Sequence, residues 1–174
     1  MLFRSLKMDT EEMKKIAIIG AGNLGQAIAK GLLKSGKFLP EDITLTRRTL
    51  SEITSFEESG FRVTDNNSSA VQESELIIIS VGPQNAEQVL NSFKDVINSD
   101  KHIIISTMTG VSIDAIHNTV GQQIPIVRIM PNTAVAICES MTCLAALDSD
   151  YESLEIVKKV FDQLGKTLDR KSVV

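Results

Sequence analysis

The sequence has little of what marks metal, redox or membrane proteins. Its 174 residues include no tryptophan, one tyrosine, two histidines and two cysteines. Cys138 and Cys143 are not spaced as C-x-x-C and lie in no His/Cys cluster, which disfavours a metal site or a redox motif. We expect two buried free thiols and a reducing, cytoplasmic environment. No apolar run reaches the length that spans a membrane, so no membrane partner is expected.

The chain also lacks an excess of positive charge. It has 18 Lys and Arg against 22 Asp and Glu, a net charge of −4 and a pI of about 5.2. Nucleic-acid binding needs a concentrated basic surface, so no nucleic-acid partner is expected. Residues 1–13 carry no long apolar stretch after their basic residues and are interpreted as a frayed leader. Residues 14–174 have the length of one globular domain.

What the sequence does contain is a regular alternation of short apolar runs with amphipathic stretches. Runs such as 76–81 are apolar almost throughout, which suits a parallel sheet covered by helices on both faces. The repetition predicts an α/β fold, a Rossmann-type doubly wound, mostly parallel sheet. Strands are expected at 16–19, 43–46, 61–64, 76–81, 103–105, 126–130, 141–147 and 166–168.

Helices are expected between most of these strands. Thr49-x-x-Glu52 and Ser149-x-x-Glu152 have the spacing of helix-capping boxes, and Gly60 and Gly165 are placed to end the helices that follow. Further helical patterns lie at 24–34, near 70–71, at 84–97 and at 112–119. In such sheets ligands bind at the carboxyl ends of the strands, which directs attention to the loops there.

The first of these loops is glycine-rich: Gly20-Ala21-Gly22-Asn23-Leu24-Gly25. Between a strand and a helix, this G-x-G-x-x-G pattern is typical of dinucleotide binding. Gly20 permits a tight turn, Gly22 lets the backbone approach a pyrophosphate, and Gly25 lets helix and strand pack closely. The alternative is a glycine-rich turn that binds nothing.

The second strand ends in Thr46-Arg47-Arg48-Thr49, with no acidic residue. An acid at this point binds the ribose of NAD, whereas guanidinium groups suit the 2′-phosphate of NADP. The sequence therefore predicts NADP(H), with NAD(H) as the alternative cofactor. The other interpretation is that one arginine is an ordinary solvated residue.

Three later loops end strands on the same side of the sheet: the first is a Gly-Pro turn that can run close to a cofactor, and the other two add small polar groups. Ordinary turns or capped loops are the alternative. His102 and His117 are expected in surface or helix-end roles, and no catalytic residue is nominated. If the protein is an enzyme, its cofactor supplies the chemistry. The loops are Val81-Gly82-Pro83, Ser106-Thr107-Met108-Thr109-Gly110 and Met130-Pro131-Asn132-Thr133.

Taken in order, these segments resemble the pyrroline-5-carboxylate reductase family over about residues 14–170, with Asn67 as a further match. The segment Arg128-Ile129-Met130-Pro131-Asn132-Thr133 is the most specific. The resemblance implies NAD(P)H-dependent reduction of a cyclic imino acid to proline, in proline biosynthesis. The residues it implies in cofactor binding are Gly20, Gly22, Asn23, Leu24, Gly25, Thr46, Arg47, Arg48, Asn67, Val81, Gly82, Pro83, Thr107, Met108, Thr109 and Asn132.

The chain departs from the family's pattern in places. Gly82 stands where the family usually has lysine, Met108 and Thr109 stand where it usually has small residues, and Ala134 replaces a second proline. The family also continues with a helical domain that dimerises and supplies most of the substrate pocket. The expectation is thus a truncated form of a reductase whose full-length family forms homo-oligomers, with the oligomeric state of this chain left open. The alternatives are a dinucleotide-binding module without activity of its own, or a reductase of another small imine or carbonyl.

Overall fold

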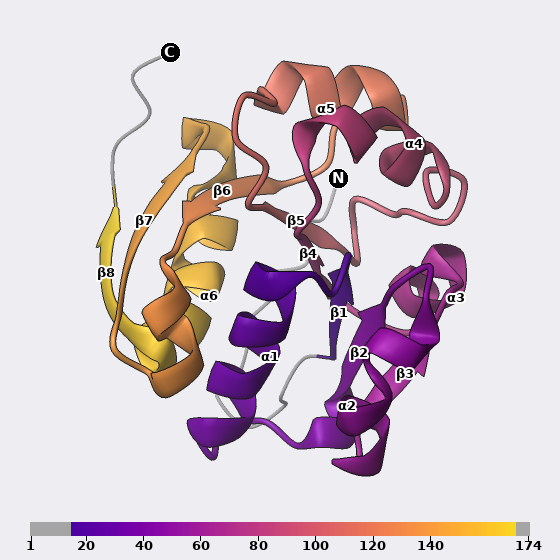
Figure 1. Cartoon of the computed structure of the whole chain (residues 1–174). Coiled ribbons are helices and arrows are strands. Elements are labelled where there is room, and N and C mark those ends of the chain that lie inside the picture. The colour runs from indigo at the N-terminus through magenta and orange to yellow at the C-terminus, as the bar shows by residue number, and fades with distance from the viewer. Residues whose placement is uncertain (1–14, 170–174) are drawn as a thin grey trace.

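The computed structural model describes residues 15–169 and contains one continuous sheet flanked by helices (Figure 1). The expected leader at 1–13 lies outside the described residues. Within them the sheet has eight strands in the order β3-β2-β1-β4-β5-β6-β7-β8. The strands are β1 Ile16–Ile19, β2 Ile43–Thr46, β3 Arg62–Thr64, β4 Leu76–Ile79, β5 Ile103–Ser106, β6 Ile126–Met130, β7 Ser140–Ala146 and β8 Gly165–Asp169.

The sheet is doubly wound, as the sequence predicts. Strands β1 to β6 pair in parallel, whereas β7 runs antiparallel to β6 and β8 runs parallel to β7. The chain winds outward from β1 to β3 and returns to β4 on the other side of β1. The strand order therefore reverses between β1 and β4, where α/β sheets bind ligands.

Helices form a layer on each face of the sheet. Helices α1, α2 and α6 pack on one face, and α3, α4 and α5 pack on the other. The helices are α1 Asn23–Lys34, α2 Thr54–Glu58, α3 Asn67–Gln72, α4 Ala86–Asn91, α5 Ile113–Val120 and α6 Tyr151–Phe161. Short 3₁₀ helices lie at η1 Pro40–Asp42, η2 Leu50–Glu52, η3 Pro83–Asn85, η4 Thr133–Ile137, η5 Asp148–Asp150 and η6 Asp162–Leu164.

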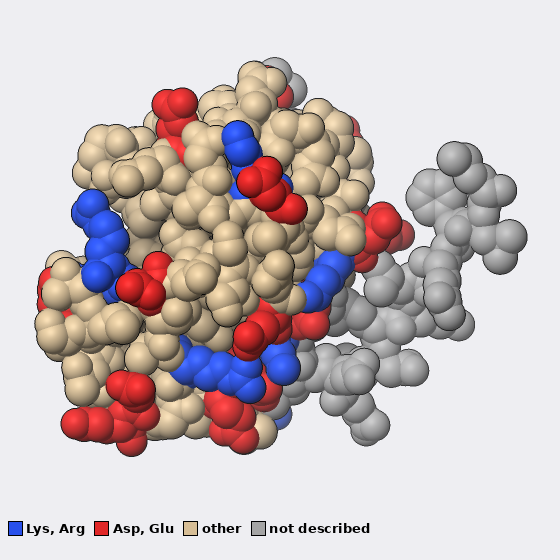
Figure 2. All heavy atoms as spheres, turned by 90° about the vertical axis from the view of Figure 1, so that its right-hand side faces the viewer, with Lys and Arg blue, Asp and Glu red and all other residues tan. Residues whose placement is uncertain are grey.

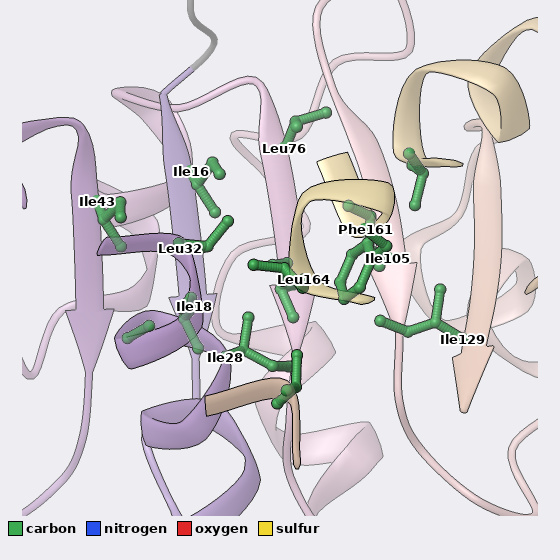
Figure 3. Packing of buried hydrophobic residues seen from close by; sticks show 14 of the residues in the cluster. Ile16, Ile18, Ile28, Leu32, Ile43, Leu76, Ile105, Ile129, Phe161 and Leu164 are labelled. Carbon is green, nitrogen blue, oxygen red and sulfur yellow. The ribbon is translucent and has the colours of Figure 1, made fainter. Parts of the chain in front are cut away.

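The central strands are apolar throughout because both of their faces are buried. Ile16 and Ile18 of β1 pack beneath α1, whereas Ala17 and Ile19 face the opposite layer. Figure 3 shows the first of these two cores, with Ile28 and Leu32 of α1 and Phe161 of α6 over the strands. The alternation follows from the two-residue period of a strand. Burial on both faces explains why the sequence shows continuous apolar runs.

The backbones of helix α1 and η4 are in direct contact at Gly31. A Cβ at Gly31 would lie 2.1 Å from the carbonyl oxygen of Val135, so no larger residue fits there without movement. The half-buried Cys138, which follows η4 with a φ of 62°, also lies against α1, its Sγ 3.5 Å from the Gly31 carbonyl oxygen. The segment after β6 is thereby fixed to the helix that follows the glycine loop.

Both expected capping boxes are wrong. Thr49 makes no side-chain cap bond, and Glu52 pairs with Arg47 instead, so the segment forms the separate helices η2 and α2. Near α6, the Ser149 hydroxyl donates to Asp150, whose other carboxylate oxygen accepts the Ile126 N–H at 3.1 Å. In each case a side chain of the expected box bonds to another side chain, Glu52 to Arg47 and Ser149 to Asp150, and not to the helix backbone.

The expected helix at 84–97 is also shorter, because α4 ends at Asn91. Ser92, which follows it, accepts the Ser68 hydroxyl on its carbonyl at 2.7 Å and so is held by α3. The segment beyond turns to bury Phe93 and Ile97 in the core.

The expectations for the thiols and histidines need correction. Cys138 is only half-buried, and Cys143 is exposed, because α6 covers one face of β7 and the described residues leave the other face open. His102 and His117 are both buried rather than on the surface, although His117 does lie near the end of α5. Neither pair lies near the carboxyl ends of β1 and β4.

Candidate cofactor-binding site

The loops at the carboxyl ends of β1, β4 and β5 enclose an open cleft of ≈ 290 Å³. Its volume is at the small end of the range for ligand pockets, so it would take only part of a dinucleotide. Every lining residue except Ser80 belongs to the set predicted from the sequence. The lining residues are Gly22, Asn23, Leu24, Ser80, Val81, Gly82, Pro83, Thr107 and Thr109.

The three glycines of the loop have three different surroundings. Gly20 has a φ of 90°, and a Cβ there would lie 2.3 Å from Val81 Cγ1. A Cβ at Gly25 would lie 2.7 Å from the Gly20 carbonyl oxygen, where α1 crosses β1. A Cβ at Gly22 would meet nothing within 4 Å, because it would project into the cleft. The fold requires Gly20 and Gly25, whereas the free space at Gly22 is space that a ligand could occupy.

The amino end of α1 points its backbone donors at this space. The first N–H groups of a helix have no acceptor within the helix, and here Gln26 donates the first helical bond, to Gly22, at 2.9 Å. Gly22, at the N-cap, has no side chain to cap the others, and the first turn of α1 has no acidic residue. The amides of Asn23 and Leu24 and the helix dipole therefore favour an anion in the cleft.

Thr46 holds the glycine loop in place. Its carbonyl oxygen accepts the N–H groups of Gly20 at 3.2 Å and Ala21 at 2.8 Å. Its hydroxyl oxygen also accepts the Gly20 N–H, at 3.3 Å, and the residue is only 2% exposed. The Thr46 hydroxyl is thus directed at the loop backbone. A direct contact of this hydroxyl with a ribose, as the sequence suggests, has no support in this geometry.

Arg47 and Arg48 differ in their surroundings. Arg47 donates from Nη1 to the Ala21 carbonyl oxygen at 2.5 Å and from Nη2 to the Glu52 carboxylate. Arg48 is exposed. On the one face of the molecule shown in Figure 2, acidic and basic side chains are interspersed. The pairing of Glu52 with Arg47 was not predicted; the available signal was a glutamate five residues after an arginine at a strand end.

Asn67, Met108 and Asn132 do not line the cleft. The Asn67 amide donates to the Ser92 hydroxyl at 2.9 Å, and Asn132 caps η4 by accepting the Ala134 N–H at 3.0 Å. Met108 is 2% exposed and packs in the core beneath α4 and α5, so its side chain points away from the cleft. Ser80, by contrast, lines the cleft and directly precedes the predicted Val81, which was the available signal for it.

The residues that line the cleft include no carboxylate, histidine, lysine or cysteine. Burial, with a smaller effect of the like charge on Lys101, lowers the pKa of His102. His102 immediately precedes β5 and therefore lies at the amino ends of the strands, opposite the cleft. Between residues 15 and 169 no cluster of three or more His, Cys, Asp or Glu side chains could hold a metal ion. None of the helices in that range has the length and apolar character of a membrane crossing.

Comparison with known proteins agrees with the resemblance seen in the motifs. Residues 15–110 match the family described as "NADP oxidoreductase coenzyme F420-dependent". Pyrroline-5-carboxylate reductases 1 and 2 of Dictyostelium discoideum are 41% and 39% identical over 165 and 176 residues, covering 88% and 92% of this chain. The chain spans 30% and 58% of their respective lengths.

Solved structures give the same result for the fold. A pyrroline-5-carboxylate reductase from Coxiella burnetii superposes with a TM-score of 0.85 at 27% identity, covering 93% of this chain and 60% of that one. The expected resemblance and the expected Rossmann-type fold are both confirmed.

Proposed function

The chain belongs to the family described as "NADP oxidoreductase coenzyme F420-dependent", and on this premise we propose that the cleft at the β1–β4 switch point binds NADP(H) for hydride transfer. The observation that carries the proposal is Gly22. Its missing side chain leaves open space directly beside the free amides of α1. A cradle that a single methyl group would fill, at the positive end of a helix, fits a pyrophosphate.

The rest of the cleft fits the other half of the cofactor. Val81 to Pro83 and Thr107 to Thr109 lie on the β4 and β5 side of the glycine loop, and Thr107 donates its hydroxyl to the Ile79 carbonyl at 3.1 Å. This bond orients the Thr107 side chain in the cleft wall. These residues would position a nicotinamide ring, and the bound cofactor would supply the hydride.

We further propose that the full protein reduces 1-pyrroline-5-carboxylate to proline. The support is the 41% and 39% identity to enzymes of that name, together with the matching strand-end motifs. In this role the described residues bind and orient the cofactor. Because the chain spans only 30% and 58% of these two relatives' lengths, the groups that bind the imino acid are assigned to no residue here.

A second candidate is a dinucleotide-binding module with no turnover of its own. The observation that favours it is the cleft lining, which contains no carboxylate, histidine, lysine or other group able to transfer a proton at neutral pH. A reductase of another small imine or carbonyl is the third candidate, and it follows from the departures at Gly82 and Met108. Turnover of the imino acid separates the first candidate from the other two.

Calorimetric titration of the chain with NADPH and with NADH tests cofactor binding. We expect NADPH to bind, and Arg47→Ala/Arg48→Ala to lower its affinity roughly 10- to 100-fold, since hydrogen bonds to charged groups are strong. NADH should change by no more than about threefold, because it has no 2′-phosphate.

Lys37→Ala/Arg62→Ala is the matched control. It removes the same charge from the amino ends of the strands, opposite the cleft, because Lys37 follows the end of α1 and Arg62 begins β3. Binding of neither nucleotide, or equal losses in both double variants, would contradict the proposed site. NADPH binding without reduction of pyrroline-5-carboxylate by the purified full-length protein would favour the binding-module candidate.

A further inference from the structure

We propose that Glu52 determines nucleotide selectivity at this site by competing with the 2′-phosphate of NADP(H) for Arg47. This inference rests on the proposed cofactor site. It begins from the ion pair between the Arg47 Nη2 and the Glu52 carboxylate, which brings η2 back against the end of β2.

The sequence shows no acid at the end of β2, but the fold places one there. Glu52 lies six positions beyond Thr46, on the 3₁₀ helix that follows the strand. An acid beside this strand end is the device that binds ribose hydroxyls and disfavours a 2′-phosphate. The site therefore combines the arginines that suit NADP with a carboxylate that suits NAD.

The contacts of Arg47 make the competition direct. One end of its guanidinium donates to the Ala21 carbonyl at 2.5 Å, and the other end is taken by Glu52. A phosphate is bound best by two parallel N–H groups of one guanidinium edge. Since Nη1 is held by the Ala21 carbonyl and Nη2 contacts the Glu52 carboxylate, a phosphate that binds Arg47 through Nη2 competes with Glu52.

The pair is weak enough to be displaced. The Arg47 and Glu52 side chains are 28% and 50% exposed, and ion pairs of such exposure are screened by water and salt. Glu52 thus lowers the affinity for NADP(H) without closing the site to it. Arg48, which is exposed, remains available to the same phosphate.

Glu52→Gln tests the proposal, with Glu73→Gln as its matched control. Glu73 pairs with Arg62 at 2.7 Å and is 53% exposed, but it follows the end of α3, away from the cleft. We expect Glu52→Gln to raise NADPH affinity roughly two- to fivefold, the effect of an exposed ion pair. NADH affinity should stay the same or fall, so that the NADPH/NADH affinity ratio rises, and Glu73→Gln should leave this ratio unchanged.

A second pair of variants makes the outcome specific to Arg47. In an Arg47→Ala background, Glu52→Gln should no longer raise the ratio through relief of competition. Equal changes for both nucleotides, an unchanged ratio, or the same gain without Arg47 would overturn the role of Glu52 while leaving NADPH binding by the wild-type chain intact. Binding of neither nucleotide to the wild-type chain would instead overturn the cofactor site, and this inference with it.

Discussion

Gly20 and Gly22 belong to the same loop, but replacing each with alanine would place the added methyl group in different surroundings. At Gly20 it would strike Val81 and require a positive φ, whereas at Gly22 it would stand in the open cleft. The pair thus separates a glycine that the fold needs from one that the ligand site needs.

We predict that Gly22→Ala folds normally and loses its cofactor. Its free energy of unfolding should change by no more than about 1 kcal/mol, because its φ of −79° suits alanine and the N-cap preference for glycine over alanine is modest. NADPH affinity should fall by roughly tenfold or more, as Cβ would occupy pyrophosphate space. Urea denaturation and calorimetry measure the two quantities.

The matched substitution in the same loop is Gly20→Ala, which should cost several kcal/mol of stability, on the order of 2–5, through strain and overpacking. Wild-type NADPH affinity in a folded Gly22→Ala protein would show that the dinucleotide does not cross this glycine.

His102 makes stability depend on pH. Burial, and to a lesser extent Lys101, lowers its pKa in the folded chain, although backbone carbonyls of Val71 and Ser74 act in the opposite direction. Its Nδ1 accepts the Asn98 N–H at 2.9 Å, so Nε2 carries the proton of the neutral ring. The unfolded chain, with a pKa near 6.5, takes up a second proton at a higher pH than the folded chain does.

The stability that this histidine contributes is therefore full above about pH 6.5 and is lost as the pH falls below that value towards the folded pKa. Urea midpoints at pH 7.5 and pH 5 should differ more for the wild type than for His102→Gln. Equal pH dependence of the two proteins would show that the histidine does not couple protonation to folding.

At this scale the sequence predicted which loops carry the site better than which side chains face it. Glycine spacing located the loop because the fold leaves no room for a Cβ at Gly20 and Gly25. Side-chain direction was not available: Thr107 and Thr109 face the cleft, but Met108 between them turns into the core. That alternation depends on where the strand ends, which local composition does not specify.

At the scale of elements, the close backbone contact between α1 and η4 allows packing to be tested by a single substitution. We predict that Gly31→Ala lowers the free energy of unfolding by roughly 1–3 kcal/mol, because its Cβ would overlap the Val135 carbonyl oxygen. Urea denaturation measures the loss. Lys34→Ala, at an exposed position of the same helix, should stay within about 0.5 kcal/mol of the wild type; a similar small change for Gly31→Ala would mean that η4 yields without cost.

Elements with a strong local cause were predicted well, and elements with a tertiary cause were not. The buried strands appear where continuous apolar runs place them, since two buried faces require such runs. The failures at Thr49 and Ser149 both come from competing side-chain bonds. Glu52 pairs with Arg47, and the Ser149 hydroxyl donates to Asp150, which is itself held by the distant Ile126 N–H.

At the scale of the whole molecule, the fold class followed from strand–helix alternation, but the direction of β7 did not. A parallel pair needs a crossover of a dozen or more residues, and the segment between Met130 and Ser140 contains only the short η4. The antiparallel turn is thus the physically available connection. Helix α6 then provides the crossover that makes β8 parallel to β7.

The two backbone hydrogen bonds that the Thr46 carbonyl oxygen accepts also have a kinetic consequence. Its carbonyl holds the Gly20 and Ala21 amides, and Arg47 holds the Ala21 carbonyl, so the loop is fixed to β2 without any ligand. A dinucleotide arriving here needs no loop closure before it is bound. We therefore expect association to be limited by encounter and orientation, so that differences in affinity among loop variants arise mainly from how long the nucleotide stays bound.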